Sequence, residues 1–112
     1  MDDISFDDFL KVELRVGEIV SAEPFPEARK PAYILHVDFG EALGVRKSSA
    51  QITDLYGIDE LVGKRVVAVV NFPAKQIGPI RSQCLVTGFH DEQGRVALCV
   101  PDQHVPLGSK LL

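Results

Sequence analysis

The residues from 71 to 82, NFPAKQIGPIRS, include the side chains best suited to binding a ligand. Lys75 and Arg81 supply positive charge, and Phe72 and Ile80 supply apolar contact surface. Two prolines and one glycine favour a stiff connection with a tight turn, which lowers the entropy lost on binding. Cations beside apolar groups can hold an extended polypeptide, or the phosphates and bases of a nucleic-acid strand.

The charge distribution sets this stretch apart from the rest of the chain. The net charge is −4, and residues 1–28 hold eight acids against two cations. Residues 61–90, in contrast, hold four Lys or Arg residues and no acid. We therefore expect a local positive field around residues 71–82. The negative total argues against a protein devoted to tight nucleic-acid binding.

The other residue types that could catalyse a reaction or bind a metal form no recognisable constellation. The histidines at positions 36, 90 and 104 have no ligand neighbours at metal spacing. Ser48-Ser49 is not part of a GxSxG motif, and Gly63-Lys64 lacks the upstream glycine of a phosphate-binding loop. We therefore expect no cofactor and no enzyme. An enzyme would need a site assembled between two copies of the chain.

The cysteines and the apolar runs indicate where the protein resides. Cys84 and Cys99 lie in apolar stretches without a CxxC motif, which favours buried reduced thiols, with a disulfide between neighbouring strands as the alternative. The longest apolar run, Val66–Val70, is too short to span a membrane. The N-terminus is acidic where a signal peptide would be basic. We expect a cytoplasmic protein that does not insert into membranes.

The elements that would position these residues are mostly short strands. A strand over 12–16 alternates apolar and polar residues, and its phase slips at Gly17, which indicates a β-bulge. Three prolines predict a loop over 23–31. Residues 33–39 alternate cleanly, with the odd-numbered side chains facing the core and His36 facing solvent. Further strands are expected over 45–52, 64–71, 83–89 and 95–100.

Two short helices are expected. Ser5 followed by acids predicts a helix start, and Phe6, Phe9 and Leu10 share one helix face that must dock on the barrel or on a second subunit. A second helix is expected over 55–61, capped by Asp54 or Asp59 and closed by Gly63.

These elements predict an all-β OB-fold. It is a five-stranded Greek-key barrel with a short N-terminal helix and a helix between strands 3 and 4. Residues 1–112 are expected to form one domain, with a helical N-terminal extension over 1–11 and a C-terminal tail over 101–112.

Two long segments, LRVGEIVSAEPFPEARKPAYILHVDFG and LVGKRVVAVVNFPAKQIGPIRSQCLVTG, resemble the tRNA-binding domain family. That family appends an OB-fold to methionyl- and phenylalanyl-tRNA synthetases, and the resemblance covers about residues 10–107. Within the family, EPFPEARKPAYIL, RKSSAQIT, VVNFPAKQIGPIRS and PDQHVPLGSKL resemble the CsaA-type export-related chaperones. Gln83-Cys84 stands where synthetase-linked domains usually carry Gly-Met, which also favours the CsaA branch.

The resemblance implies a non-enzymatic, export-related chaperone that acts as a homodimer and binds unfolded or precursor polypeptides. The export motor ATPase is then a further expected partner. The apolar helix face and a tail ending in Leu111-Leu112 independently favour a dimer, although both could instead plug the barrel ends. The alternative function is a tRNA-binding module that acts in trans on tRNA or on a tRNA synthetase, with weak affinity for tRNA.

The predicted site lies where the connection between the fourth and fifth strands borders the binding face of an OB-fold. Phe25, Arg29 and Lys30 of the 23–31 loop are expected on the neighbouring surface. The predicted peptide- or tRNA-binding residues are Arg46, Lys47, Ser48, Gln51, Asn71, Phe72, Lys75, Ile80, Arg81 and Ser82.

Overall fold

The longest strand, β1 (Leu14–Pro24), organises the fold in a computed structural model that describes residues 1–112. Its first half pairs with β4 and its second half with β2, both antiparallel. The strands of the main sheet lie in the order β3-β2-β1-β4-β7. Besides β1, they are β2 (Tyr33–Asp38), β3 (Val45–Ala50), β4 (Arg65–Val69) and β7 (Leu85–Val86).

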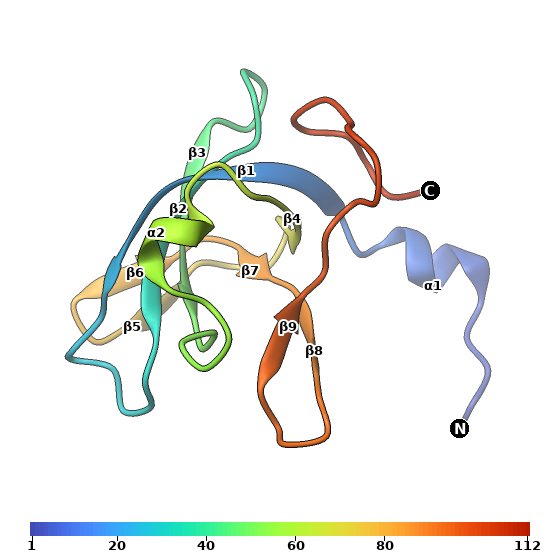
Figure 1. The fold of residues 1–112 in the computed structure, drawn as a ribbon. Coiled ribbons are helices and arrows are strands. Elements are labelled where there is room, and N and C mark those ends of the chain that lie inside the picture. Colours follow the sequence, from blue (N-terminus) through green and yellow to red (C-terminus); the bar gives the residue numbers. More distant parts are fainter.

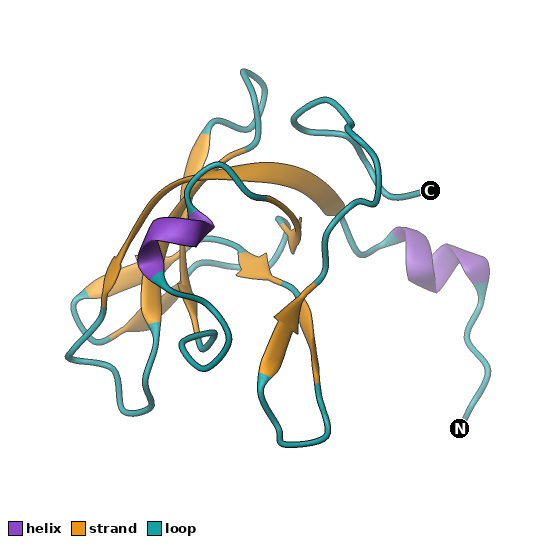
Figure 2. Ribbon diagram, in the orientation of Figure 1, coloured by secondary structure: helices purple, strands orange, loops and turns teal.

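Two hairpins and two short helices complete the structure (Figures 1 and 2). The hairpin strands are β5 (Lys75–Ile77), β6 (Ile80–Ser82), β8 (Gly88–His90) and β9 (Val96–Leu98). The helices are α1 (Phe6–Leu10) and α2 (Ile58–Leu61). The five-stranded antiparallel sheet curls into a nearly closed barrel, which confirms the predicted OB-fold with helices at the expected positions.

The barrel closes along a seam between β3 and residues 82–84. The Gln83 N–H donates to the Lys47 carbonyl at 2.7 Å, and the Gln83 side-chain Oε1 accepts from the Lys47 N–H at 2.9 Å. The Ser49 N–H donates to Ser82 Oγ at 3.3 Å. A side-chain hydroxyl and a side-chain amide thus replace part of a regular backbone ladder.

The core is apolar and confirms the predicted alternation in β2. Leu35, Val37 and Phe39 are at most 1% exposed, and they pack with residues of β1 and β4. Leu61 of α2 is fully buried against the same cluster, so the short helix covers one part of the barrel (Figure 2). The core therefore assembles from side chains far apart in the sequence.

The predicted bulge at Gly17 is wrong. Gly17 pairs in regular register with Val66 of β4, and the register shifts instead between Ile19 and Ser21. Glycine is needed at position 17 for packing, because an added Cβ would lie 2.5 Å from Val37 Cγ1 and 2.8 Å from the Phe39 ring.

Several predicted boundaries also change. β1 begins at Leu14 rather than at 12, β3 ends at Ala50 rather than at 52, β4 covers Arg65–Val69 rather than 64–71, and α2 begins at Ile58 rather than at 55. β1 continues to Pro24, which pairs with Tyr33, so the loop begins at Phe25. The expected strand over 83–89 is broken at Thr87, whose N–H donates to the Val67 carbonyl at 3.0 Å, and it forms β7 and β8 instead. The last strand is shorter than the predicted range 95–100.

The N-cap of α2 also differs from the prediction. Gly57 is the N-cap residue, and its N–H donates to Glu60 Oε1 at 2.6 Å. Neither Asp54 nor Asp59 takes that position. Gly63, at φ +93°, follows the helix as expected.

Helix α1 begins at the predicted N-cap, Ser5, but it does not dock on the barrel. Ser5 Oγ accepts from the Asp8 N–H at 3.0 Å. The helix projects away from the barrel in Figure 1, and Phe6 is 68% exposed. Its apolar face is therefore uncovered in a single chain. Neither helix of the structure has the length and apolar content required to cross a membrane.

Replacing Gly17 with alanine should lower the free energy of unfolding by about 1–3 kcal/mol, because the new methyl group would overpack the core against Val37 and Phe39. Chemical denaturation measures the loss. Gly57→Ser is the matched control, since an added Cβ at Gly57 would meet only Glu60 Oε1, at an ordinary contact distance of 3.9 Å, and serine is a favoured N-cap. Equal stability of the two variants would contradict this account of Gly17.

Candidate ligand-binding groove

A groove of about 960 Å³ lies between the β5–β6 hairpin and the loop that joins β1 to β2. Its other sides are formed by the end of β3 with the residues that follow it, and by β7, β8 and β9. The apolar lining consists entirely of aliphatic side chains, and no Phe, Tyr or Trp takes part. These aliphatic residues are Ala28, Ala32, Ala50, Ile52, Ile77, Leu85, Val86 and Val96.

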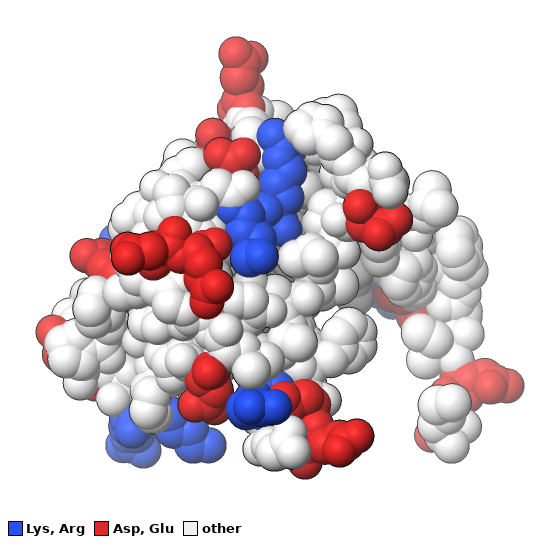
Figure 3. Space-filling view, in the orientation of Figure 1, with Lys and Arg blue, Asp and Glu red and all other residues white.

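The charged residues of the groove are mostly cations without acidic partners. Arg29, Lys30 and Lys75 line it, and none of them forms an ion pair within the chain. Glu27 is the one acid among the lining residues. Lys and Arg side chains gather at the lower left edge of Figure 3, where the loop between β1 and β2 lies in Figure 1. The groove is therefore suited to a ligand that carries negative charge.

Phe25 fixes the loop against the hairpin. Its side chain is 3% exposed, so the expectation that Phe25 contacts ligand is wrong. The Phe25 N–H donates to the Ala32 carbonyl at 3.2 Å, and an added Cβ at Gly78 would lie 3.7 Å from Phe25 Cζ. Gly78 has φ +52°, as a two-residue hairpin turn with glycine first requires. The two sides of the groove thus meet at this contact.

Of the residues predicted to bind ligand, Gln51 and Lys75 line the groove. Phe72 is 55% exposed, as expected for a contact residue, but it lies outside the groove lining. Ile80 and Arg81 belong to β6, which does not line the groove either.

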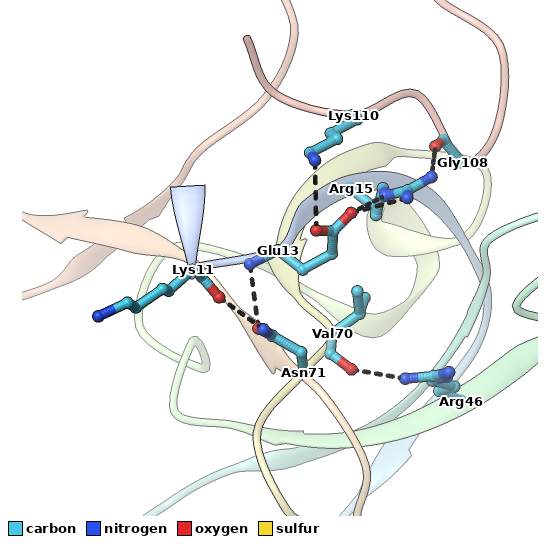
Figure 4. A network of polar contacts seen from close by, with 8 residues as sticks. All are labelled: Lys11, Glu13, Arg15, Arg46, Val70, Asn71, Gly108 and Lys110. Carbon is cyan, nitrogen blue, oxygen red and sulfur yellow. Dashed lines mark hydrogen bonds and ion pairs between the residues drawn. The ribbon is translucent and has the colours of Figure 1, made fainter. Parts of the chain in front are cut away.

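The other predicted site residues hold the barrel together. Ser48 is fully buried, which removes its side chain from the binding surface. The Ser82 side chain forms a seam hydrogen bond, whereas Lys47 takes part in the seam through its backbone N–H and carbonyl only. The Arg46 guanidinium donates to the Val70 carbonyl at 2.7 Å (Figure 4). Polar residues near the hairpin therefore serve the fold as much as the surface.

Sequence reasoning missed the groove residues contributed by β7, β8 and the loop. Leu85 and Thr87 were missed because one continuous strand is predicted over 83–89, and His90 was missed because it has no neighbours at metal spacing. Glu27 of the loop and Gln76 of β5 were missed because the prediction favoured cations and apolar side chains. The signal available in the sequence was Gly88, since a glycine within a strand often marks the close approach of another backbone segment. In the structure, an added Cβ at Gly88 would lie 2.7 Å from the Ala97 carbonyl oxygen.

The prediction of buried thiols is confirmed for Cys84, whereas Cys99 is only half-buried. Cys84 is buried, and burial raises its pKa to about 11. Both cysteines are free, so no disulfide joins the strands. The Cys84 Sγ lies 3.7 Å from the Lys47 carbonyl, inside the seam.

A network of charged side chains joins the two ends of the chain at the start of β1 (Figure 4). Arg15 donates twice to Glu13 Oε1, at 2.7 and 3.0 Å, and once to the Gly108 carbonyl at 2.9 Å. Lys110 Nζ lies 3.5 Å from Glu13 Oε2. The hydrogen bond from Arg15 lowers the pKa of the Glu13 carboxyl below its ordinary value of 4.5, and Lys110 adds to this effect.

Asn71 belongs to the same network. Its Oδ1 accepts from the Glu13 N–H at 3.0 Å, and its Nδ2 donates to the Lys11 carbonyl at 2.7 Å. The Asn71 amide, predicted to bind ligand, is thus engaged in holding the segment that enters β1.

Comparisons with known proteins agree with this architecture. The model of a family described as a putative tRNA binding domain matches residues 14–110. The chain belongs to this family. Among curated members, the methionine–tRNA ligase of Pyrococcus abyssi is 39% identical over 108 residues, which are 96% of this chain and 14% of that protein. The chain therefore spans about a seventh of the length of this relative.

Solved structures of similar length also match this family member. The chaperone CsaA from Bacillus anthracis is 46% identical with a TM-score of 0.92, over 99% of this chain and all of that chain. The CsaA chaperone protein from Picrophilus torridus is 46% identical with the same TM-score, over 98% of this chain and all of that chain. These matches confirm the resemblance to CsaA that the sequence motifs indicated.

The lowered pKa of Glu13 predicts an attachment of the C-terminal tail that is sensitive to acid. The stability that the Glu13 ion pairs contribute is fully present above pH 4.5, the ordinary pKa of this carboxyl. It is lost as the pH falls through the lower pKa that the carboxyl has in the folded state. Hydrogen exchange of the Leu111 amide, which donates to the Leu14 carbonyl, measures the attachment. In Glu13→Gln, this amide should already exchange faster at neutral pH and respond less to acid. A parallel acid response in both proteins would contradict the prediction.

Proposed function

We propose that this protein is a non-enzymatic chaperone of the CsaA type that binds extended segments of unfolded or precursor polypeptides. The observation that carries the proposal is the groove. Its aliphatic lining residues, named above, form a floor, and the unpaired cations Arg29, Lys30 and Lys75 lie at its rim. Aliphatic side chains of an unfolded polypeptide lose water when they pack on such a floor, and this burial supplies binding energy without a fixed sequence. The similarity to two CsaA structures supports the same reading.

The groove favours a polypeptide over a nucleic acid. Binding of single-stranded nucleic acid draws much of its energy from bases stacked on aromatic rings, about 1–3 kcal/mol for each base. No Phe, Tyr or Trp lines the groove, and Phe72 lies outside it. A tRNA-binding module acting in trans is the second candidate. It is supported by the family description and by the unpaired cations Arg29, Lys30 and Lys75.

The uncovered apolar surface supports action as a homodimer. Phe6 and Leu10 of α1 are 68% and 42% exposed, and Leu111 and Leu112 are exposed as well. The Leu111 N–H donates to the Leu14 carbonyl, so the tail reaches β1 a few residues after α1 ends. A second copy would cover both surfaces at once. The export motor ATPase as a partner and a cytoplasmic location stay predictions.

Leu85→Ser should weaken the binding of a fluorescein-labelled precursor peptide by about 5- to 10-fold, because it removes a half-exposed aliphatic side chain from the groove floor. Fluorescence anisotropy measures the affinity. Val62→Ser is the control, since Val62 is similarly exposed at 52% but lies outside the groove. Absence of peptide binding by the parent protein would exclude the chaperone proposal.

A salt titration of the same proteins separates the two candidates. Peptide affinity that rests on aliphatic contact should change little with salt. For tRNA, the logarithm of the association constant should fall with the logarithm of the salt concentration, with a slope of about −0.7 to −0.9 for each phosphate neutralised. Binding of tRNA without binding of peptide would favour the module acting in trans.

The parent chain should sediment as a dimer, and the double variant Phe6→Ser, Leu10→Ser should sediment as a monomer, because it removes the apolar face of α1. Sedimentation velocity measures the mass. Val62→Ser again serves as the control, because it changes an exposed apolar side chain away from α1. A monomeric parent chain would exclude the homodimer.

A further inference from the structure

The outer edge of β5 carries unused hydrogen-bonding groups. β5 and β6 form a sheet of two strands, so β5 has a partner on one side only. The register pairs Ile77 with Ile80 next to the two-residue turn, then Gln76 with Arg81. In such a hairpin the pair next to the turn is hydrogen-bonded, and the following pair directs its N–H and C=O groups away from the partner strand. No hydrogen bond from elsewhere in the chain reaches the backbone of Gln76.

This edge of β5 faces the groove. Lys75, Gln76 and Ile77 line the groove, whereas no residue of β6 does. β6 lies on the other side, next to β3, where Ser82 bonds to Ser49. The Gln76 side chain donates to the Gly78 carbonyl at 2.8 Å, so it is engaged with the turn. An extended chain in the groove would therefore lie alongside free backbone donors and acceptors.

We propose that an extended polypeptide adds to this edge of β5 as a third strand. The inference rests on the proposed function, because it specifies how the same groove holds its polypeptide. Main-chain hydrogen bonds to Gln76 provide affinity that is independent of sequence. Successive side chains of an added strand point to opposite sides, so every second one contacts the aliphatic floor that includes Ile52 and Leu85.

The charges of the groove select the kind of segment that binds. Three unpaired cations, Arg29, Lys30 and Lys75, face the groove against the single acid Glu27. A segment that contains acidic residues among aliphatic ones gains favourable Coulomb energy here, and a basic segment is repelled. The favoured occupant is thus a polypeptide strand rich in aliphatic and acidic residues.

Backbone N-methylation of the ligand tests the strand directly. The probe is a labelled peptide of alternating valine and glutamate, made in two further forms with N-methyl groups on either the valines or the glutamates. Only one set of N–H groups faces β5 in a strand, so one form should lose about tenfold or more in affinity while the other stays close to the parent peptide. The valine–lysine counterpart should bind about tenfold more weakly.

Two protein variants test the same edge. Gln76→Pro removes the outward N–H without removing a bond to β6, and it should weaken binding of the valine–glutamate peptide. Gln76→Ala is the matched control, because it keeps the N–H and loses only the side chain. Thermal denaturation checks that both variants are folded.

The outcomes separate this inference from the proposed function. Equal affinity of the two N-methylated forms would overturn the added strand while leaving polypeptide binding intact. Equal affinity of the glutamate and lysine peptides would overturn the selection for acidic segments. Failure of every peptide to bind, with RNA binding in the groove instead, would overturn the proposed function together with this inference.

Discussion

The arrangement of the whole groove depends on the seam that closes the barrel. β3 and residues 82–84 are joined by one backbone hydrogen bond and by side-chain bonds of Gln83 and Ser82. These bonds place β6 beside β3, and β5 is thereby held over the groove. A seam made by side chains needs particular residue types at particular positions. This requirement explains why the polar residues Ser82 and Gln83 occur after the apolar strand β4.

Local sequence patterns were sufficient to predict the fold class. The alternation over 33–39 identified Leu35, Val37 and Phe39 as core residues, and the hydroxyl of Ser5 identified the start of α1. Gly17 could not be assigned correctly in the same way. A glycine within a strand fits either a bulge or the close approach of another chain segment, and the side chain that approaches it comes from β2.

The candidate site was harder to predict than the fold. Lys75 and Gln51 lie in the groove lining, and both were selected from local patterns, because hairpin and strand ends are recognisable in the sequence. Ser82 and Asn71 looked like ligand-binding residues, but their partners lie far away in the sequence and only the structure brings them together. Phe25 was misjudged for a related reason, since a phenylalanine between two prolines resembles an exposed contact residue until its neighbour, Gly78, is known.

The pairing of the tail with β1 has a consequence for how the protein is made. Arg15 and Gly108 are 93 positions apart, yet they share a hydrogen bond, and the Val16 N–H donates to the Ser109 carbonyl. Contacts between such distant positions slow folding, because a long loop must close before they form. During synthesis on the ribosome, the start of β1 must therefore remain without this neighbour until residues 108 and 109 have been made.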